Sequence, residues 1–211
     1  CTGMLASLGG PDPGRNLVLR AEVIWHKTNG LPESVQDRVR RSHETWFHFT
    51  REPRYFAAVD AIREAHVYPN DDRSKRPNGY AREMTGHMNG GPNPLGKLPG
   101  SVWTVATQPM KVPAELGVDH FAAFPMGLPR RIIPAWSPLG GLVVDPFGGT
   151  GTTALVARTQ GRNAISCDLS DDYCRIAEWR INDPAELARA LGDRKPVQPT
   201  TGQIGLFGEA S

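Results

Sequence analysis

The sequence predicts an α/β fold organised around a short strand, a glycine turn and a helix. Residues 142–144 are apolar on consecutive positions, as expected for a strand inside a parallel sheet that is covered on both faces. Gly148, Gly149 and Gly151 follow, and glycine lets the backbone turn sharply and approach a ligand closely. The N–H groups that open the next helix would present positive partial charge to that ligand.

A second strand and helix are expected directly after this unit. The helix that opens at Thr152 or Thr153 should end at Gly161, a residue suited to the position after a helix. A strand over 163–167 then ends at Asp168. Ser170 is the expected N-cap of the following helix, which carries an apolar stripe that consists of Tyr173, Ile176, Ala177 and Ile181.

Further elements are expected on both sides of this unit. Strand composition marks 17–27, 45–50 and 101–107. Apolar residues in 55–65 are spaced for one face of a helix, and Pro129 begins another helix whose Ile132 and Ile133 face the core. Asp183 caps a last helix that stops at Gly192. The rest of the C-terminal segment, 193–211, has the composition of a flexible tail.

Length and composition restrict the class of protein. A chain of 211 residues with 39% hydrophobic content can bury one real core. The net charge of +2 is too small to indicate nucleic-acid binding by itself. The three cysteines form no CxxC pair, so neither a disulfide framework nor a zinc site is expected and a reducing cytosol is the default. No apolar run has the length of a membrane span, and no signal peptide is recognisable.

The glycine turn matches neither of two common phosphate-binding turns. A dinucleotide fold requires a third glycine inside the helix, but Ala154 and Leu155 follow the threonines here. A P-loop requires a lysine, which this turn lacks. The segment instead resembles the D-P-F-x-G-[ST]-G-T-T motif of S-adenosylmethionine-dependent DNA amino-methyltransferases. This cofactor has no phosphate, so its turn has none to bind.

The resemblance extends over most of 17–181. The segments LRAEVIWHK and PESVQDRVRRSHE resemble a block of the β-ordered subgroup of these enzymes, which phages, plasmids and restriction-modification systems often carry. Leu31 departs from the methionine usual in that block. The segment 120–125, followed by Leu128, Ile132 and Ile133, resembles the one that closes over the methionine end of the cofactor. The resemblance implies a Rossmann-like methyltransferase sheet.

The resemblance also implies a cofactor site. Asp145 would bind the ammonium group of S-adenosylmethionine, directly or through water, and Asp168 would accept both ribose hydroxyls. The alternative is that Asp168 only caps a helix. The complete set of expected cofactor-binding residues is His120, Phe121, Phe124, Pro125, Asp145, Pro146, Phe147, Gly148, Gly149, Thr150, Gly151, Thr152, Thr153 and Asp168.

Double-stranded DNA is the implied partner. Residues 66–100 fall where the family carries its target-recognition region, although a plain solvated loop has the same composition. On this interpretation 1–65 and 101–192 are parts of the methyltransferase domain, the second of which binds the cofactor. The expected DNA-binding residues are basic: Lys27, Arg38, Arg73, Lys75, Arg76 and Arg82.

The catalytic tetrapeptide of this family, (D/N/S)-P-P-(Y/F/W), occurs nowhere in the sequence. In the β-ordered subgroup it precedes the recognition region, so we expect an N-terminally truncated enzyme whose sheet lacks the strand that carries this loop. No catalytic residue is therefore assigned. A catalytically inactive module that binds DNA or cofactor, and an NAD-dependent Rossmann-like enzyme, stay open as alternatives.

One peptide in the tail suggests a second partner. Residues 203–207, and within them Gln203, Leu206 and Phe207, resemble the Q-L-x-L-F peptide by which bacterial proteins bind the replication sliding clamp. The family resemblance further implies a prokaryotic or phage-infected cytoplasm. Neither the recognition sequence nor the choice between adenine and cytosine can be inferred from these residues.

Overall fold

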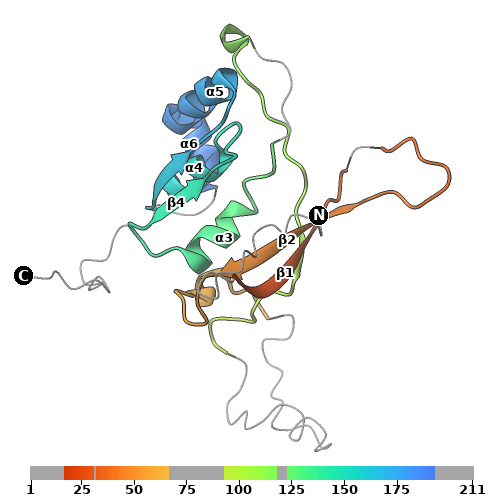
Figure 1. Cartoon of the computed structure of the whole chain (residues 1–211), viewed down its shortest axis with the longest axis vertical. Coiled ribbons are helices and arrows are strands. Elements are labelled where there is room, and N and C mark those ends of the chain that lie inside the picture. Colours follow the sequence, from red (N-terminus) through yellow and green to blue (C-terminus); the bar gives the residue numbers. More distant parts are fainter. Residues whose placement is uncertain (1–16, 31, 67–92, 118–122, 193–211) are drawn as a thin grey trace, which may run out of the picture. The chain divides into compact units, whose positions relative to one another are not determined.

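The computed structural model describes residues 17–30, 32–66, 93–117 and 123–192, which form two separate compact units (Figure 1). The first unit is Cys1–Ala106 and the second is Thr107–Ser211. Each unit is described by itself. Within the described ranges, no helix has both the length and the apolar character needed to cross a membrane.

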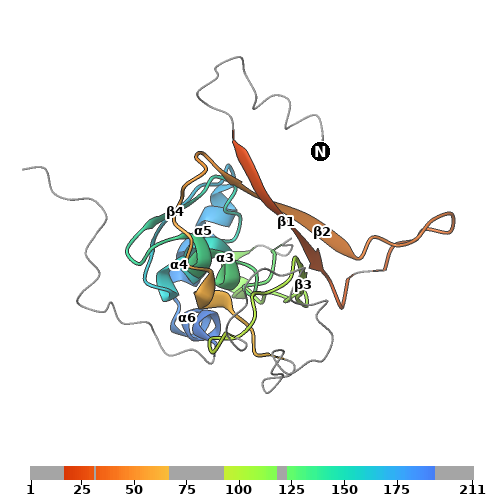
Figure 2. The same cartoon turned by 90° about the horizontal axis from the view of Figure 1, so that it is seen from below.

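The first unit is built on a three-stranded sheet with the order β2-β1-β3. β1 (Val18–His26) pairs antiparallel with β2 (His43–Thr50), and Figure 2 shows the two as a long pair of strands. β3 (Val102–Thr104) pairs in parallel with β1, with Trp25 opposite Trp103. Both indole rings are buried, and each Nε1–H donates to a backbone carbonyl at 2.8 Å. The three strands expected from the sequence are confirmed.

The prediction of a helix over 55–65 is wrong. A short 3-10 helix, η1 (Val59–Ile62), is the regular structure found there. Glu64 instead forms an antiparallel bridge with Lys97, with reciprocal N–H···O distances of 2.9 Å. Because Glu64 uses its backbone groups in that bridge, the helix cannot continue through it.

Within its described residues, the second unit contains a β-α-β arrangement and four further helices. β4 (Leu142–Asp145) and β5 (Asn163–Ser166) are parallel and are connected by α4 (Thr152–Thr159). The remaining helices are η3 (Ala114–Leu116), α3 (Pro129–Trp136), α5 (Asp171–Asn182) and α6 (Pro184–Leu191). The expected pattern is confirmed at four positions. Helix α4 begins at Thr152, Gly161 after it has a positive φ, and Ser170 and Asp183 cap α5 and α6.

The core of the second unit lies on one face of the β4–β5 sheet. It consists of side chains from α4 together with Met126, Ile133 of α3 and Ala190 of α6. Val143 and Ala164 point into this core from the two strands. Leu155 and Val156 at its centre are fully buried.

The expectation that residues 142–144 are covered on both faces is wrong for the described part of the chain. Leu142 is 57% exposed and Val144 is 56% exposed, whereas Val143 between them packs against the core. Ile165 of β5 is also exposed, at 49%. The reason is that the core helices pack on the face that carries Val143 and Ala164.

Replacement of Leu155 by alanine is expected to destabilise the second unit by roughly 2–5 kcal/mol, because it leaves a cavity among fully buried side chains. The matched control is Leu169→Ala, since the Leu169 side chain is fully exposed. Urea denaturation of the two variants measures the difference. Equal midpoints for both variants would contradict this description of the core.

Candidate functional site

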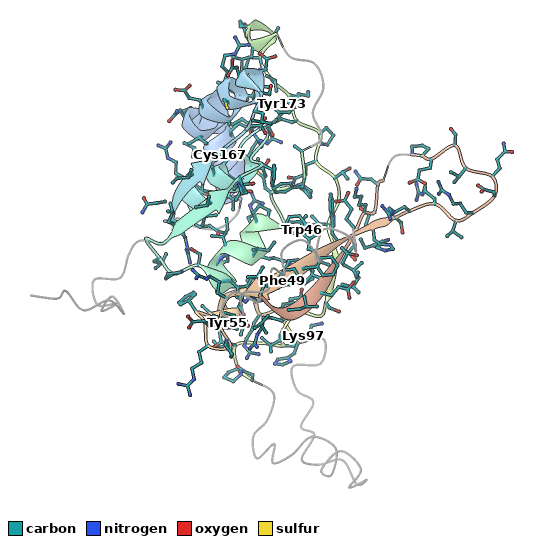
Figure 3. All side chains as sticks on the ribbon, viewed as in Figure 1. Trp46, Phe49, Tyr55, Lys97, Cys167 and Tyr173 are labelled. Atoms are coloured by element: carbon teal, nitrogen blue, oxygen red, sulfur yellow. The ribbon has the colours of Figure 1, made fainter. Side chains whose placement is uncertain are left out.

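The glycine turn, residues 145–151, lies at the carboxyl end of the β4–β5 sheet. Beyond the last strand pair, the Cys167 N–H donates to the Asp145 carbonyl at 2.9 Å and the Gly148 N–H donates to the Cys167 carbonyl at 2.7 Å. These bonds bring the turn beside the segment that leads from β5 into α5, where Figure 3 labels Cys167. Tyr173, also labelled there, lies in α5. In open α/β sheets, ligands bind at this end of the strands.

Two glycines of the turn lie so close to a neighbouring element that an added Cβ atom would overlap it. A Cβ atom on Gly148 would lie 1.8 Å from the Ser166 Oγ atom, which is far inside van der Waals contact. Gly151 has a φ of +75°, and a Cβ there would lie 2.7 Å from the Cβ of Ala177 on α5. Gly149 also adopts a positive φ, +51°, which favours glycine. The turn therefore packs closely against both β5 and α5.

The carboxylates of Asp145 and Asp168 accept hydrogen bonds from the glycine turn and from the residues next to it. Asp145 accepts hydrogen bonds from the Phe147 N–H at 3.1 Å and from the Thr153 hydroxyl at 2.6 Å. Asp168 accepts from the Gly149 N–H at 3.0 Å and from the Ser170 N–H at 2.9 Å. A carboxylate has about four acceptor positions, so each aspartate keeps capacity for a ligand.

The capping role at α5 belongs to another residue. The Ser170 hydroxyl accepts from the Tyr173 N–H at 3.4 Å and is the N-cap. Asp168 instead connects the turn after β4 to the turn after β5. This geometry does not match the alternative in which Asp168 serves only as a helix cap.

Arg180, which was not among the expected site residues, contacts the glycine turn. Its guanidinium lies in the interior, 3% exposed, and donates from Nη1 to the Thr150 carbonyl at 2.9 Å. The same nitrogen lies 3.0 Å from the hydroxyls of Thr150 and Thr152. The signal was present, because Arg180 falls seven residues after Tyr173 and so continues the apolar stripe of the helix.

Glu186 neutralises the buried guanidinium. The Arg180 Nε atom donates to Glu186 Oε2 at 3.0 Å, and Glu186 is likewise 3% exposed. Burial lowers the pKa of Arg180 from its ordinary value, while the hydrogen bond and the charge of Glu186 raise it. Arginine stays charged in proteins, so the buried cation depends on this carboxylate.

The remaining expected cofactor residues differ in their surroundings. Phe147 is 82% exposed, whereas Thr150 and Thr152 are buried and direct their hydroxyls to Arg180. Pro125 is buried and Phe124 is half-buried ahead of α3. His120 and Phe121 lie outside the described residues. Among the residues described, no group of three or more histidine, cysteine, aspartate or glutamate side chains is placed to hold a metal.

The two described candidates for DNA contact lie in the first unit. Lys27 forms an ion pair with Glu44, and its Nζ atom is 4.6 Å from the centroid of the Trp25 ring. Arg38 lies in the exposed segment between β1 and β2, with Nη1 3.5 Å from Glu33 Oε2. The other four, Arg73, Lys75, Arg76 and Arg82, fall outside the described residues.

An α/β unit with a glycine turn and two carboxylates at the strand ends has the arrangement of the Rossmann-like class of folds, in which ligands bind at this end of the strands. The DNA methylase family (N6_N4_Mtase) matches residues 12–179 of the chain. The chain belongs to this family.

Named relatives agree with this assignment. The type II methyltransferase M.SmaI of Serratia marcescens is 32% identical over 163 residues, which are 77% of this chain and 46% of that protein. M.ScaI of Streptomyces caespitosus is 33% identical over 169 residues, covering 78% of this chain and 51% of that protein. The chain spans about half the length of these relatives.

Solved structures show the same fold. The PvuII DNA methyltransferase, named as cytosine-N4-specific, superposes with a TM-score of 0.58 at 20% identity and covers 83% of this chain and 58% of that one. The M1.HpyAVI–SAM complex gives a TM-score of 0.50 at 17% identity and covers 79% of this chain and 64% of that one. The expected Rossmann-like methyltransferase fold is confirmed, with small sheets in the described part of the chain.

Replacement of Gly148 by alanine is expected to destabilise the second unit by roughly 1–3 kcal/mol, because the new methyl group would overlap Ser166. Ser166→Gly in the same chain should recover most of that loss, since it removes the atoms that the methyl group meets. Gly100→Ala is the control, as no atom lies within 4 Å of its added Cβ. Urea denaturation that shows no rescue by Ser166→Gly would contradict the close approach.

Proposed function

We propose that this chain supplies the cofactor-binding part of an S-adenosylmethionine-dependent DNA methyltransferase. The enzyme would transfer a methyl group to an exocyclic amine of adenine or cytosine in a specific DNA site. The observation that carries the proposal is the joining of the glycine turn, Asp145 and Asp168 at one end of the β4–β5 sheet, in a chain of the DNA methylase family.

The residues of the turn fit the chemistry of this cofactor. Asp145 has acceptor capacity for the ammonium group of the methionine portion, and Asp168 has capacity for the ribose hydroxyls. The turn contains no lysine to pair with a phosphate, and the cofactor has none. When bound, the cofactor supplies an electrophilic methyl group on a sulfonium. The task of these residues is to bind the cofactor and to orient it at the strand ends.

The residues that would activate the target amine are not among these 211. No (D/N/S)-P-P-(Y/F/W) tetrapeptide is present to accept the amine hydrogens and to stack on a flipped-out base. The proposal therefore gives this chain the cofactor half of the active site. By itself the chain is expected to bind S-adenosylmethionine without methylating DNA.

Two alternative functions compete with this proposal, and three details of it are predictions. Family membership argues against an NAD-dependent enzyme, whereas a catalytically inactive binding module differs only in the absence of turnover. DNA contact by Lys27 and Arg38 stays a prediction, as does a cytoplasmic location in a prokaryotic or phage-infected cell. Sliding-clamp binding through Gln203, Leu206 and Phe207 also stays a prediction, on residues outside the described ranges.

Asp168→Asn is expected to weaken S-adenosylmethionine binding about tenfold or more, because a charge-assisted hydrogen bond to the ribose is worth roughly 1.5–3 kcal/mol. Asp172→Asn is the matched control, since Asp172 is an exposed carboxylate in the first turn of α5. Equilibrium dialysis with labelled cofactor measures both variants. Equal affinity in the two variants would contradict the role given to Asp168.

If the coding sequence around these residues supplies a (D/N/S)-P-P-(Y/F/W) tetrapeptide, its expression in a host that lacks DNA methylation is expected to leave N6-methyladenine or N4-methylcytosine in the host DNA. Mass spectrometry of the digested nucleosides detects either base. A gene that carries Asp168→Asn should give less of the modified base at equal protein level. Unmodified DNA in cells that contain folded, cofactor-binding protein would favour the inactive module.

A further inference from the structure

Arg180 and Asp168 bind different backbone groups of the glycine turn. Asp168 binds the N–H of Gly149, whereas Arg180 binds the carbonyl of Thr150. The peptide that joins Thr150 to Gly151 is consequently fixed at both ends, because the Gly151 N–H donates to the Gly148 carbonyl at 2.9 Å. A rotation of this peptide would break both of these bonds.

The same guanidinium also reaches the start of α4. Its Nη1 atom lies 3.0 Å from the Thr152 hydroxyl, and Thr152 is the first residue of that helix. One side chain of α5 thus joins the last part of the turn to the helix that follows it. The Arg180 side chain is buried, as are Thr150 and Thr152, so water cannot replace these bonds.

The partner of Arg180 is itself held in place. Glu186 lies in the first turn of α6, where its N–H donates to the capping carboxylate of Asp183 at 2.8 Å. Its second carboxylate oxygen accepts from Arg189. The guanidinium is therefore bound between Glu186 of α6 and the glycine turn, and it has little freedom to change its orientation.

The cost of burying the Arg180–Glu186 pair indicates that the pair positions the turn more than it stabilises the fold. Transfer of an arginine and a glutamate from water to the interior costs several kcal/mol per ion, and well-packed apolar residues often replace such pairs without loss of stability. The Arg180 Nη1 group lies within 3.0 Å of three oxygen atoms of Thr150 and Thr152, and its two hydrogens are shared among them, a set of contacts that apolar residues cannot make. The buried charges therefore serve to fix the geometry of the turn.

We propose that Arg180 is a positioning residue for the cofactor site, which through Thr150 and Thr152 fixes the orientation of the glycine turn in which the cofactor binds. This inference rests on the proposed function for its ligand. It predicts that loss of the guanidinium loosens the turn and weakens binding, while the second unit stays folded.

Arg180→Lys keeps a positive charge beside Glu186 but lacks the fork that reaches both threonines. The variant is expected to fold, to exchange the amide hydrogens of Gly149 and Gly151 at least tenfold faster, and to bind S-adenosylmethionine at least tenfold more weakly. Arg175→Lys is the matched control, because Arg175 lies on the same helix, is exposed and pairs with Asp172. The control is expected to match the wild type in exchange and in affinity.

A double variant, Arg180→Met with Glu186→Leu, removes both buried charges and separates positioning from stability. We expect a thermal midpoint at or above that of the wild type, together with the same loss of affinity. Wild-type affinity in the double variant, or in Arg180→Lys, would overturn the proposal. Failure of either variant to fold would also overturn it, because the pair would then serve the fold. If the wild type does not bind S-adenosylmethionine, the proposed function fails. Amide exchange of Gly149 and Gly151 still tests whether Arg180 fixes the turn.

Discussion

The contact between the glycine turn and β5 is the constraint on which the site depends. No side chain fits between Gly148 and Ser166, so the backbone of the turn lies directly against the neighbouring strand. This approach lets the Gly148 N–H reach the Cys167 carbonyl, and it brings the turn within hydrogen-bond distance of Asp168. A larger residue at position 148 would overlap Ser166, so either the turn or the Ser166 side chain would have to move.

Hydrogen bonds from Asp145, Asp168 and Arg180 then fix the geometry of the glycine turn. Asp145 and Asp168 accept backbone N–H groups of the turn, and each keeps acceptor positions for a ligand. Arg180 binds the turn from α5, with Glu186 as its counter-ion. Since Asp145, Asp168 and Arg180 all bind backbone groups of the turn, the turn is preorganised, which reduces the ordering cost of binding.

The parts of the fold that could be predicted from the sequence are those with local causes. The strand, turn and helix around Gly148, and the caps Ser170 and Asp183, follow from residue types at fixed spacing. The helix over 55–65 was wrong because a non-local bridge, Glu64 with Lys97, takes the backbone groups that a helix requires. Arg180 was missed because its role depends on two threonines about 30 residues away in the chain. Exposure of Leu142 and Val144 likewise depends on which elements pack on the sheet, not on strand composition.

The central claim is that the glycine turn binds S-adenosylmethionine and not a dinucleotide. Isothermal titration calorimetry of the wild-type protein with each ligand, at equal concentrations and in one buffer, tests it most directly. We expect a single saturable site for S-adenosylmethionine and no measurable heat of binding for NAD. Saturable binding of NAD without binding of S-adenosylmethionine would contradict the account.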